Sequence, residues 1–418
     1  TRRVRAALSS NKCALDMPIF LGGGVWPHFV PAVVDYVVSR SEFFTAYTPY
    51  QPEASQGMLQ ALFEYQSLIC ELTGMEVANC SMYDWASALG EAARMCSRIT
   101  GKKKFIVPRS ISPERKSVLF AYSEPAGIEV EFYDFDRRTG KADVDSLASK
   151  LDAGTAGVYI EVPSFFGIID DQAPEIGELA HEKKALFVVG VDPISLGILK
   201  APGDYGADIV VGEGQPLGLH MNFGGPLLGI FCSRREYVRQ MPGRIIGMTV
   251  DKEGKRAFCM ALQTREQHIR RERATSNICT NNALCAVAAA VYLCLLGPKG
   301  LRKLCETILA KSHYAAERLN QIDGVKAPAF ESEFFKEFVV SFPIDYPTVH
   351  ERLLGKGIHG GRPLPEFPEL GNAALFCVTE VHAKEEIDAL VSAVKEVVES
   401  VRRRSCTNPV CRNSLWCG

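Results

Sequence analysis

The sequence predicts an α/β protein, in which a large domain with a parallel-rich sheet is followed by a smaller α+β domain. Between Val77 and Phe231 short apolar runs alternate with helical patterns, which is typical of parallel strands buried on both faces. A second, shorter alternation of helices and strands follows residue 298. The 418 residues suffice for two or three domains, so this division fits the length of the chain.

The elements of the large domain follow an irregular N-terminal arm that contains one helical stretch, at 31–39. A helix is predicted over 55–73, because the apolar residues have helical spacing, Ser55 is a suitable N-cap and Gly74 a suitable stop. The alternating segments that come next predict strands at 77–81, 105–107, 128–133, 158–162, 186–191, 208–211 and 227–231, and helices at 86–99 and 174–184.

After Phe231 the alternation of short apolar runs ends. Charged sequence up to about Arg273 is predicted to be helical, and an apolar helix from about Asn277 to Leu296 and an amphipathic helix over 299–320 follow it. The remainder predicts strand 335–342, helix 347–355, strand 374–379 and helix 384–404. We therefore expect an arm and loop (1–65), a large domain (66–297), a small domain (298–404) and a mobile tail (405–418).

Composition excludes several classes of protein. A net charge of −2 argues against a nucleic-acid-binding protein. The longest apolar run, 283–296, has 14 residues, too few to cross a bilayer. The fourteen cysteines include no C-x-x-C pair, and the tail residues Cys406, Cys411 and Cys417 lack the spacing of zinc ligands. We expect a soluble, cytoplasmic protein with reduced thiols and no metal.

The absence of lysine from Ala201 to Asp251 is the most informative local feature. This stretch holds two predicted strands and a turn that ends at Gln215, and the preceding strand ends at Asp192. The arrangement resembles fold-type I enzymes that use pyridoxal phosphate. In those enzymes an aspartate after one strand binds the pyridine nitrogen, and a lysine after the next strand binds the cofactor covalently. With Gln215 in the region of that lysine, we expect Asp192 to cap the turn that follows it.

A second distinctive feature is the segment Thr45–Gly57, TAYTPYQPEASQG. It is a proline-stiffened loop with two tyrosines, a carboxylate and two amides, and it ends at the start of a predicted helix. Such a loop is suited to close over a small polar ligand and exclude water. The alternative is a packed surface loop whose tyrosines cover apolar area.

The loop sequence is similar to the signature of the glycine cleavage system P-protein family, the glycine decarboxylases. Further blocks of the same family follow in order, at 41–44, 70–75, 212–218, 263–271 and 274–281, so the resemblance covers about residues 20–380. The chain resembles the N-terminal half of the long P-protein, which is the alpha subunit (subunit 1) where the enzyme is split into two chains.

The resemblance implies a division of labour between two chains. A beta subunit (subunit 2) holds the pyridoxal 5'-phosphate covalently, and an α2β2 assembly decarboxylates glycine and transfers the aminomethyl group to the lipoyl arm of the H-protein. The present chain, without the lysine, completes the active site across the interface. The loop residues expected to act on the substrate are Tyr47, Tyr50, Gln51, Glu53 and Gln56.

Other contacts with the partner's cofactor are also implied. Thr275 and Ser276 precede the helix expected near Asn277, and a helix N-terminus with hydroxyl groups is suited to bind the cofactor phosphate. The alternative for these two residues is simple N-capping. His28 is a further candidate for contact with substrate, cofactor or lipoyl arm, although a single histidine is more often packed.

One departure from the family pattern lies at the start of the helix predicted over 86–99. Trp85 and Ser87 stand where the family has glycine and threonine. A bulky indole prevents the close backbone approach to a phosphate that a glycine allows. Two other functions remain open, a self-sufficient pyridoxal-phosphate enzyme of the aminotransferase or desulfurase type and a purely structural scaffold subunit.

Overall fold

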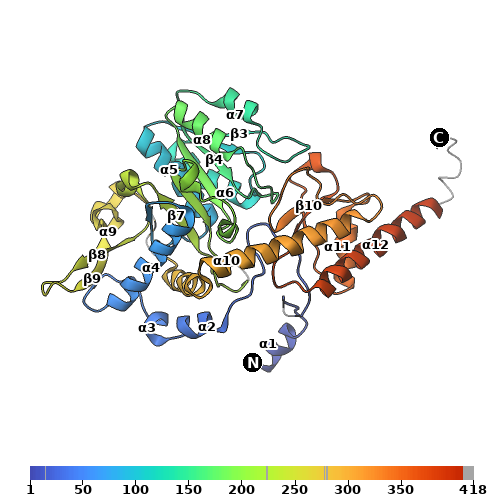
Figure 1. The fold of residues 1–418 in the computed structure, drawn as a ribbon, viewed down its shortest axis with the longest axis horizontal. Helices are drawn as coiled ribbons and strands as arrows, with labels where there is room; N and C mark the ends of the chain where they lie inside the picture. Colours follow the sequence, from blue (N-terminus) through green and yellow to red (C-terminus); the bar gives the residue numbers. More distant parts are fainter. Residues whose placement is uncertain (15, 223–224, 277, 279–280, 408–418) are drawn as a thin grey trace. The chain divides into compact units, whose positions relative to one another are not determined.

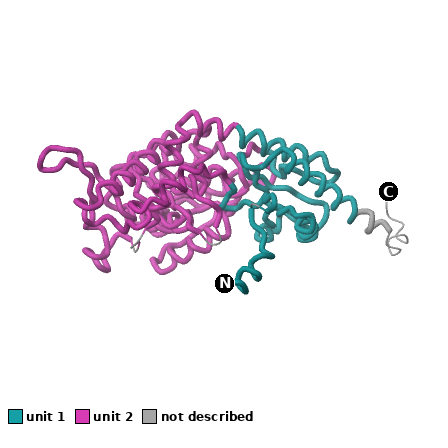
Figure 2. Tube along the Cα trace, turned by 90° about the horizontal axis from the view of Figure 1, so that it is seen from below, with its two compact units in different colours: residues 1–27, 307–331, 335–418 teal, residues 28–306, 332–334 magenta. Residues whose placement is uncertain are grey.

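A computed structural model describes residues 1–14, 16–222, 225–276, 278 and 281–407 (Figure 1). The chain divides into two compact units (Figure 2). Unit 1 comprises residues 1–27, 307–331 and 335–418, and unit 2 comprises residues 28–306 and 332–334. The N-terminal segment thus belongs with the C-terminal region, whereas the predicted domains place it in an arm of its own.

Unit 2 is built on a seven-stranded sheet in the order β1-β7-β6-β5-β4-β2-β3. Neighbouring strands from β3 to β6 are parallel, and β7 and β1 add an antiparallel edge. This arrangement confirms the predicted parallel-rich α/β sheet. The strands are β1 (Val77–Ala78), β2 (Lys104–Pro108), β3 (Glu129–Tyr133), β4 (Thr155–Glu161), β5 (Leu186–Val191), β6 (Ile209–Glu213) and β7 (Gly229–Ser233).

The central strands are apolar because they are covered on both faces, and every residue of β4, β5 and β6 is buried. Helix α5 packs along five of the strands, from β2 to β7, and α8 packs on β4 and β5. The helices of this unit are α2 (Ala32–Val38), α3 (Ser41–Phe44), α4 (Gln56–Thr73), α5 (Trp85–Thr100), α6 (Pro113–Ser123), α7 (Val144–Lys150), α8 (Ala173–Glu182) and α9 (Gln267–Arg270).

The prediction of helical sequence after Phe231 is wrong. Residues 245–261 form an antiparallel hairpin of strands β8 (Ile245–Val250) and β9 (Arg256–Ala261), drawn at the edge of unit 2 in Figure 1. Two glutamines of α4 hold it. The Gln66 side chain accepts from the Ile246 N–H (2.9 Å) and donates to the Ile246 carbonyl (3.0 Å). Gln56 does the same with Phe258, at 2.9 and 2.8 Å.

Helix α10 (Ala283–Asn320) combines the two helices predicted after Asn277, but it begins later. Gly297, with φ 57° and followed by Pro298, interrupts it close to the predicted boundary. Among the described residues α10 alone is long and apolar enough to cross a membrane, with a mean hydropathy of 1.8 over 18 residues. Half of that window is buried inside the protein, and core helices of globular proteins have the same composition.

Unit 1 contains a three-stranded antiparallel sheet in the order β10-β12-β11. Its strands are β10 (Glu337–Ser341), β11 (Arg362–Pro363) and β12 (Ala373–Cys377), and its helices are α1 (Arg2–Leu8), α11 (Tyr346–Gly355) and α12 (Lys384–Thr407). The predicted small α+β region is therefore present. Helix α12 reaches into the predicted tail, and residues 408–418, with Cys411 and Cys417, lie outside the described residues.

Candidate functional site

The carboxyl edge of the parallel strands is where an α/β sheet usually binds its ligand. Three acidic residues gather there, with Glu161 ending β4, Asp192 following β5 and Glu213 ending β6. All three are buried. The first turn of α5 approaches the same edge, since the Trp85 N–H donates to Oε2 of Glu213 at 3.2 Å.

The chain's own side chains fill this edge. Arg115 of α6 donates to both oxygens of Glu161, at 2.7 and 2.8 Å, and its guanidinium carbon lies 4.0 Å from the centre of the Trp85 ring. The Trp85 indole N–H donates to the Tyr159 hydroxyl at 3.0 Å, which in turn donates to Glu161 at 3.0 Å. A Cβ added to Gly190 of β5 would collide with Tyr159 and Trp85, so the packing leaves no space between them.

The Glu213 carboxylate is bound by three backbone N–H groups. Those of Leu228 and Gln215 donate to Oε1 at 2.9 and 3.0 Å, and that of Trp85 donates to Oε2. Burial raises the pKa of Glu213 to about 7, and the three N–H donors oppose that rise by favouring the ionised form. The Glu213 carboxyl group therefore already occupies the position that a bound anion would take at the start of α5.

Two more backbone groups at the N-terminus of α5 also have local partners. The Asp84 carboxylate accepts from the Ser87 N–H at 2.7 Å, and the Ser87 hydroxyl oxygen accepts from the Asp84 N–H at 3.2 Å. This capping box explains how serine at position 87 is used here. No phosphate can share these donors without displacing a side chain.

These residues do not fit a pyridoxal phosphate in this chain. There is no lysine from Ala201 to Asp251, and the Gln215 amide donates to the Leu219 carbonyl at 2.8 Å. Asp192 accepts from the Ile194 N–H at 3.2 Å, which confirms the expected role as a cap of the next turn. The carboxyl edge of the sheet is closed, and we call it the closed edge below.

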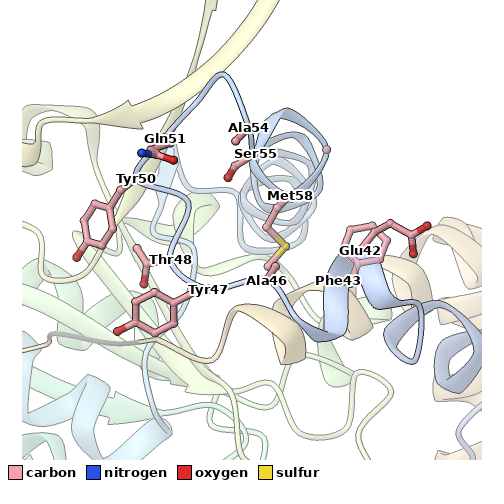
Figure 3. Close-up of a pocket in the computed structure, with 11 residues that line it drawn as sticks. Glu42, Phe43, Ala46, Tyr47, Thr48, Tyr50, Gln51, Ala54, Ser55 and Met58 are labelled. Atoms are coloured by element: carbon pink, nitrogen blue, oxygen red, sulfur yellow. The ribbon is translucent and has the colours of Figure 1, made fainter.

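A second site, the loop pocket, lies open at the segment Thr45–Gly57 (Figure 3). It has a volume of about 620 Å³. Tyr47 and Tyr50 lie side by side along the loop, and their relative exposure is 71% and 42%, which is high for aromatic residues. The lining residues are Glu42, Phe43, Ala46, Tyr47, Thr48, Tyr50, Gln51, Ala54, Ser55, Gly57 and Met58.

Three of the five residues predicted to act on the substrate, Tyr47, Tyr50 and Gln51, line this pocket. Glu53 is exposed and Gln56 is half-buried, and neither is among the lining residues. The Gln56 amide binds the backbone of Phe258 on β9 and donates to the Pro52 carbonyl at 2.8 Å. Its contacts therefore anchor the end of the loop to the hairpin.

Behind Tyr50 lies a charged cluster of Arg244, Glu266 and His268. Buried Arg244, at the base of β8, donates from Nη2 to the Tyr50 hydroxyl oxygen at 2.8 Å. Its Nε lies 3.5 Å from Glu266, whose Oε2 is also 3.6 Å from Nδ1 of His268. The sequence analysis did not single out Arg244, because the strand that follows it was predicted to be helical.

The helix that was predicted to start after Thr275 and Ser276 is described from Ala283. The predicted start of that helix lies outside the described residues, since Asn277, Cys279 and Thr280 are not among them, and the helix N-terminus at these hydroxyls stays a prediction. Ser276 donates to buried Glu91 at 2.7 Å, and burial raises the pKa of Glu91. A small cavity joins Thr275 and Ser276 to Arg244, Arg265 and Glu266.

The other expectations concern His28 and the cysteines. His28 is half-buried and lies outside the residues that line the loop pocket. The described cysteines are free thiols, and six of the ten are buried. Within the described part of the chain, no group of three or more histidine, cysteine, aspartate or glutamate residues is arranged to hold a metal ion.

Residues 2–394 match the family model of the glycine cleavage system P-protein. The chain is 53% identical to a probable glycine dehydrogenase (decarboxylating) subunit 1 from Staphylothermus marinus, over 96% of this chain and 87% of the relative. It is 56% identical to the protein of the same name from Thermococcus onnurineus, over 93% of this chain and 87% of the relative.

Solved structures agree with these relatives. The chain is similar to a crystal structure of glycine decarboxylase (P-protein) of the glycine cleavage system in inhibitor-bound form, with a TM-score of 0.89 and 44% identity over 95% of this chain and 88% of that one. A NifS-like protein has a TM-score of 0.69 at 15% identity, over 92% of this chain and all of that one. The second likeness shows the shared fold alone.

Proposed function

Because the chain belongs to the glycine cleavage system P-protein family, as subunit 1 of glycine dehydrogenase (decarboxylating), we propose that it completes an active site whose pyridoxal phosphate is held by the second subunit. The two chains together decarboxylate glycine and pass the aminomethyl group to the lipoyl arm of an H-protein. We assign them an α2β2 assembly in the cytoplasm.

The closed edge is the observation that carries this proposal. Trp85, Tyr159 and the Arg115–Glu161 pair occupy the space at the carboxyl ends of the strands, and Glu213 occupies the anion position at α5. No lysine lies between Ala201 and Asp251, the stretch that contains β6 and the turn after it. A cofactor used by this family must then be bound elsewhere, and the second subunit implied by the relatives' names is its natural carrier.

Pyridoxal phosphate, when bound in the second subunit, withdraws electrons from glycine so that carbon dioxide can leave. The residues of this chain orient the substrate and exclude water. Tyr47, Tyr50 and Gln51 present two hydroxyl groups and an amide to the loop pocket. Glu53 and Gln56 act at its margin, Glu53 as an exposed carboxylate that faces the partner and Gln56 as the anchor of the loop.

Contacts with the partner's cofactor come from the small cavity beside the loop pocket. There the hydroxyl groups of Thr275 and Ser276 line the same cavity as the buried guanidinium group of Arg265. Hydroxyl groups and arginines are suited to bind a phosphate that enters from a second chain. His28 is kept as a further contact to the substrate or the lipoyl arm.

Exposed aromatic residues support the presence of a partner on this side of unit 2. Among the described residues, the strongly exposed aromatic side chains all lie between positions 29 and 50, namely Phe29, Tyr36, Phe44, Tyr47 and Tyr50. At about 150–250 Å² for each full side chain, they expose apolar area on the order of 600 Å². A typical interface buries about 800 Å² on each partner, so an area of this order is sufficient for a large part of one.

The decisive experiment reconstitutes the enzyme from this chain, the second subunit and lipoylated H-protein. We expect glycine–bicarbonate exchange only when both subunits are present. The purified chain alone should show no pyridoxal-phosphate absorbance band and no lysine trapped by borohydride. A trapped lysine in this chain would instead identify a self-sufficient enzyme.

Loop variants separate an active-site role from a scaffold. Tyr47→Phe and Glu53→Gln, each in the reconstituted complex, should lower exchange without changing assembly. Unchanged exchange in both variants would refute the loop assignment. A change in assembly with unaltered turnover per complex would identify a structural subunit.

A further inference from the structure

Arg244 and Tyr50 form a directed pair. Nη2 of Arg244 donates to the Tyr50 hydroxyl oxygen at 2.8 Å, and the guanidinium carbon lies 5.4 Å from the centre of the Tyr50 ring. An arginine side chain only donates, so the tyrosine oxygen accepts in this bond. The single O–H of Tyr50 therefore points away from Arg244 and is left for another acceptor.

Arg244 is itself held in place on several sides. Its backbone carbonyl accepts from the Cys80 N–H at 2.9 Å, and its Nε faces Glu266 at 3.5 Å. Arg265 fixes the residues just before it, with donation from Nη1 to the Met241 carbonyl and from Nη2 to the Gly243 carbonyl at 3.1 Å. The relative exposure of Arg244 is 4%, so its side chain has little freedom to reorient.

The segment that supplies Glu266 is conformationally unusual. It is bounded by two non-glycine residues with positive φ, Leu262 at 54° and Arg271 at 53°. Such backbone is retained only where the surrounding structure imposes it, and it concentrates at functional sites. The same segment supplies His268, whose ring contacts the Tyr50 ring edge-on at 5.7 Å. Tyr50 is thus contacted by both a guanidinium group and an imidazole ring.

We propose that Arg244 is a positioning residue, which makes Tyr50 a fixed hydrogen-bond donor to the carboxylate of the substrate amino acid. The inference rests on the proposed function and adds a ligand group and a supporting residue to it. A hydroxyl group that accepts from a guanidinium is polarised and donates more strongly to an anionic oxygen. Tyr50 also lines the loop pocket, the open cavity on this face of unit 2.

The test is a double-mutant cycle in the reconstituted two-subunit enzyme, read as the glycine dependence of the decarboxylation rate. Tyr50→Phe should raise KM for glycine on the order of tenfold, with a smaller change in kcat, because one charge-assisted hydrogen bond is lost. Arg244→Gln should raise KM similarly. The double variant should be no worse than Tyr50→Phe alone, since both changes remove one interaction.

Two further variants separate positioning from general stability. Arg244→Lys keeps the positive charge and should recover part of the KM. Arg302→Gln removes an exposed arginine on α10, which pairs only with Glu306 in the following turn, and should change neither constant. Thermal melting and complex formation are measured for every variant, and Tyr50→Phe keeps the test valid if Arg244→Gln does not fold.

Three results would overturn the inference. They are an unchanged KM in Tyr50→Phe, additive losses in the double variant, or an Arg244→Gln enzyme with lowered melting temperature and wild-type KM. Failure of the proposed function itself looks different, because the wild-type complex would then not decarboxylate glycine at all.

Discussion

The closed edge and the loop pocket lie in the same unit, but the polar groups of the first are buried and those of the second are exposed. At the closed edge the acidic groups Glu161 and Glu213 are buried, and each binds several donors of the chain itself. At the loop pocket Tyr47, Tyr50 and Glu42 face open space. One site is satisfied within the chain, and the other presents groups to something outside it.

The difference shows that one unit can fill a sheet edge with its own side chains and leave a loop open to solvent. At the closed edge a tryptophan, a tyrosine and an ion pair pack against one another and leave no void between them. The exposed loop is left with apolar area and hydroxyl groups that a second chain can cover. Four experiments examine this contrast.

The largest effect is expected at the ion pair of the closed edge. Arg115→Ala leaves the Glu161 carboxylate buried without its bidentate partner, which should destabilise the chain by about 3–5 kcal/mol. Chemical denaturation of the isolated chain measures this. Arg302→Ala, which breaks an exposed pair, is the matched control and should leave the midpoint unchanged. A mild effect of Arg115→Ala would mean that the edge is hydrated and not closed.

The next effect is a dependence of stability on pH. Burial raises the pKa of Glu213 from 4.5 to about 7, so the folded chain binds more protons than the unfolded chain between these values. This contribution is fully present below pH 4.5 and is lost as the pH rises through about 7, by on the order of 3 kcal/mol at most. Glu213→Gln should remove it. Identical pH profiles of the two proteins would contradict a protonated Glu213.

A smaller effect on stability is expected at the two glutamines of α4 that bind the hairpin β8–β9. Gln66→Leu leaves the Ile246 N–H and carbonyl without their partner and should cost about 2 kcal/mol. Gln56→Leu, which is nearer to solvent, should cost less. Amide hydrogen exchange should quicken in β8 and β9 with either change. Gln60→Leu on the same helix is the control, because its amide bonds only to Glu64.

The smallest effect on stability is expected from a substitution in the loop pocket. Tyr47→Ala removes an exposed side chain, and the isolated chain should change by less than about 0.5 kcal/mol. Binding to the second subunit should nevertheless weaken, as measured by titration calorimetry. Equal losses in folding and in binding would show that Tyr47 belongs to the core of this chain and not to an interface.

Much of the fold was predictable because its signals are local. The strands β4, β5 and β6 are continuous apolar runs, and Gly74 and Gly297 end helices with positive φ as glycine allows. The hairpin β8–β9 was not predictable in the same way. Its charged residues are confined to 251–256, in and beside the turn, and its strands are bound by the side chains of Gln56 and Gln66, which lie 202 and 180 residues earlier in the chain.

Within the candidate site, too, some features were predictable from the sequence and others were not. The string Thr45–Gly57 identified a pocket and three of its lining residues, Tyr47, Tyr50 and Gln51. The string alone did not distinguish these residues from Gln56. Gln56 carries the same amide group as Gln51, but its amide binds the backbone of Phe258. The helix expected after Ser276 is described from Ala283, because apolar periodicity locates a helix but not its first turn.

The sequence by itself determined the α/β fold, the absence of a cofactor lysine and the membership of a family that works with a second chain, because composition, periodicity and motif spacing are properties of neighbouring residues. Only the tertiary structure decided that the cofactor edge is closed by Trp85, Tyr159 and Glu213, and that Arg244 lies behind Tyr50. These contacts join segments 74 to 194 residues apart, and hydrogen bonds over such separations leave no local pattern in the sequence.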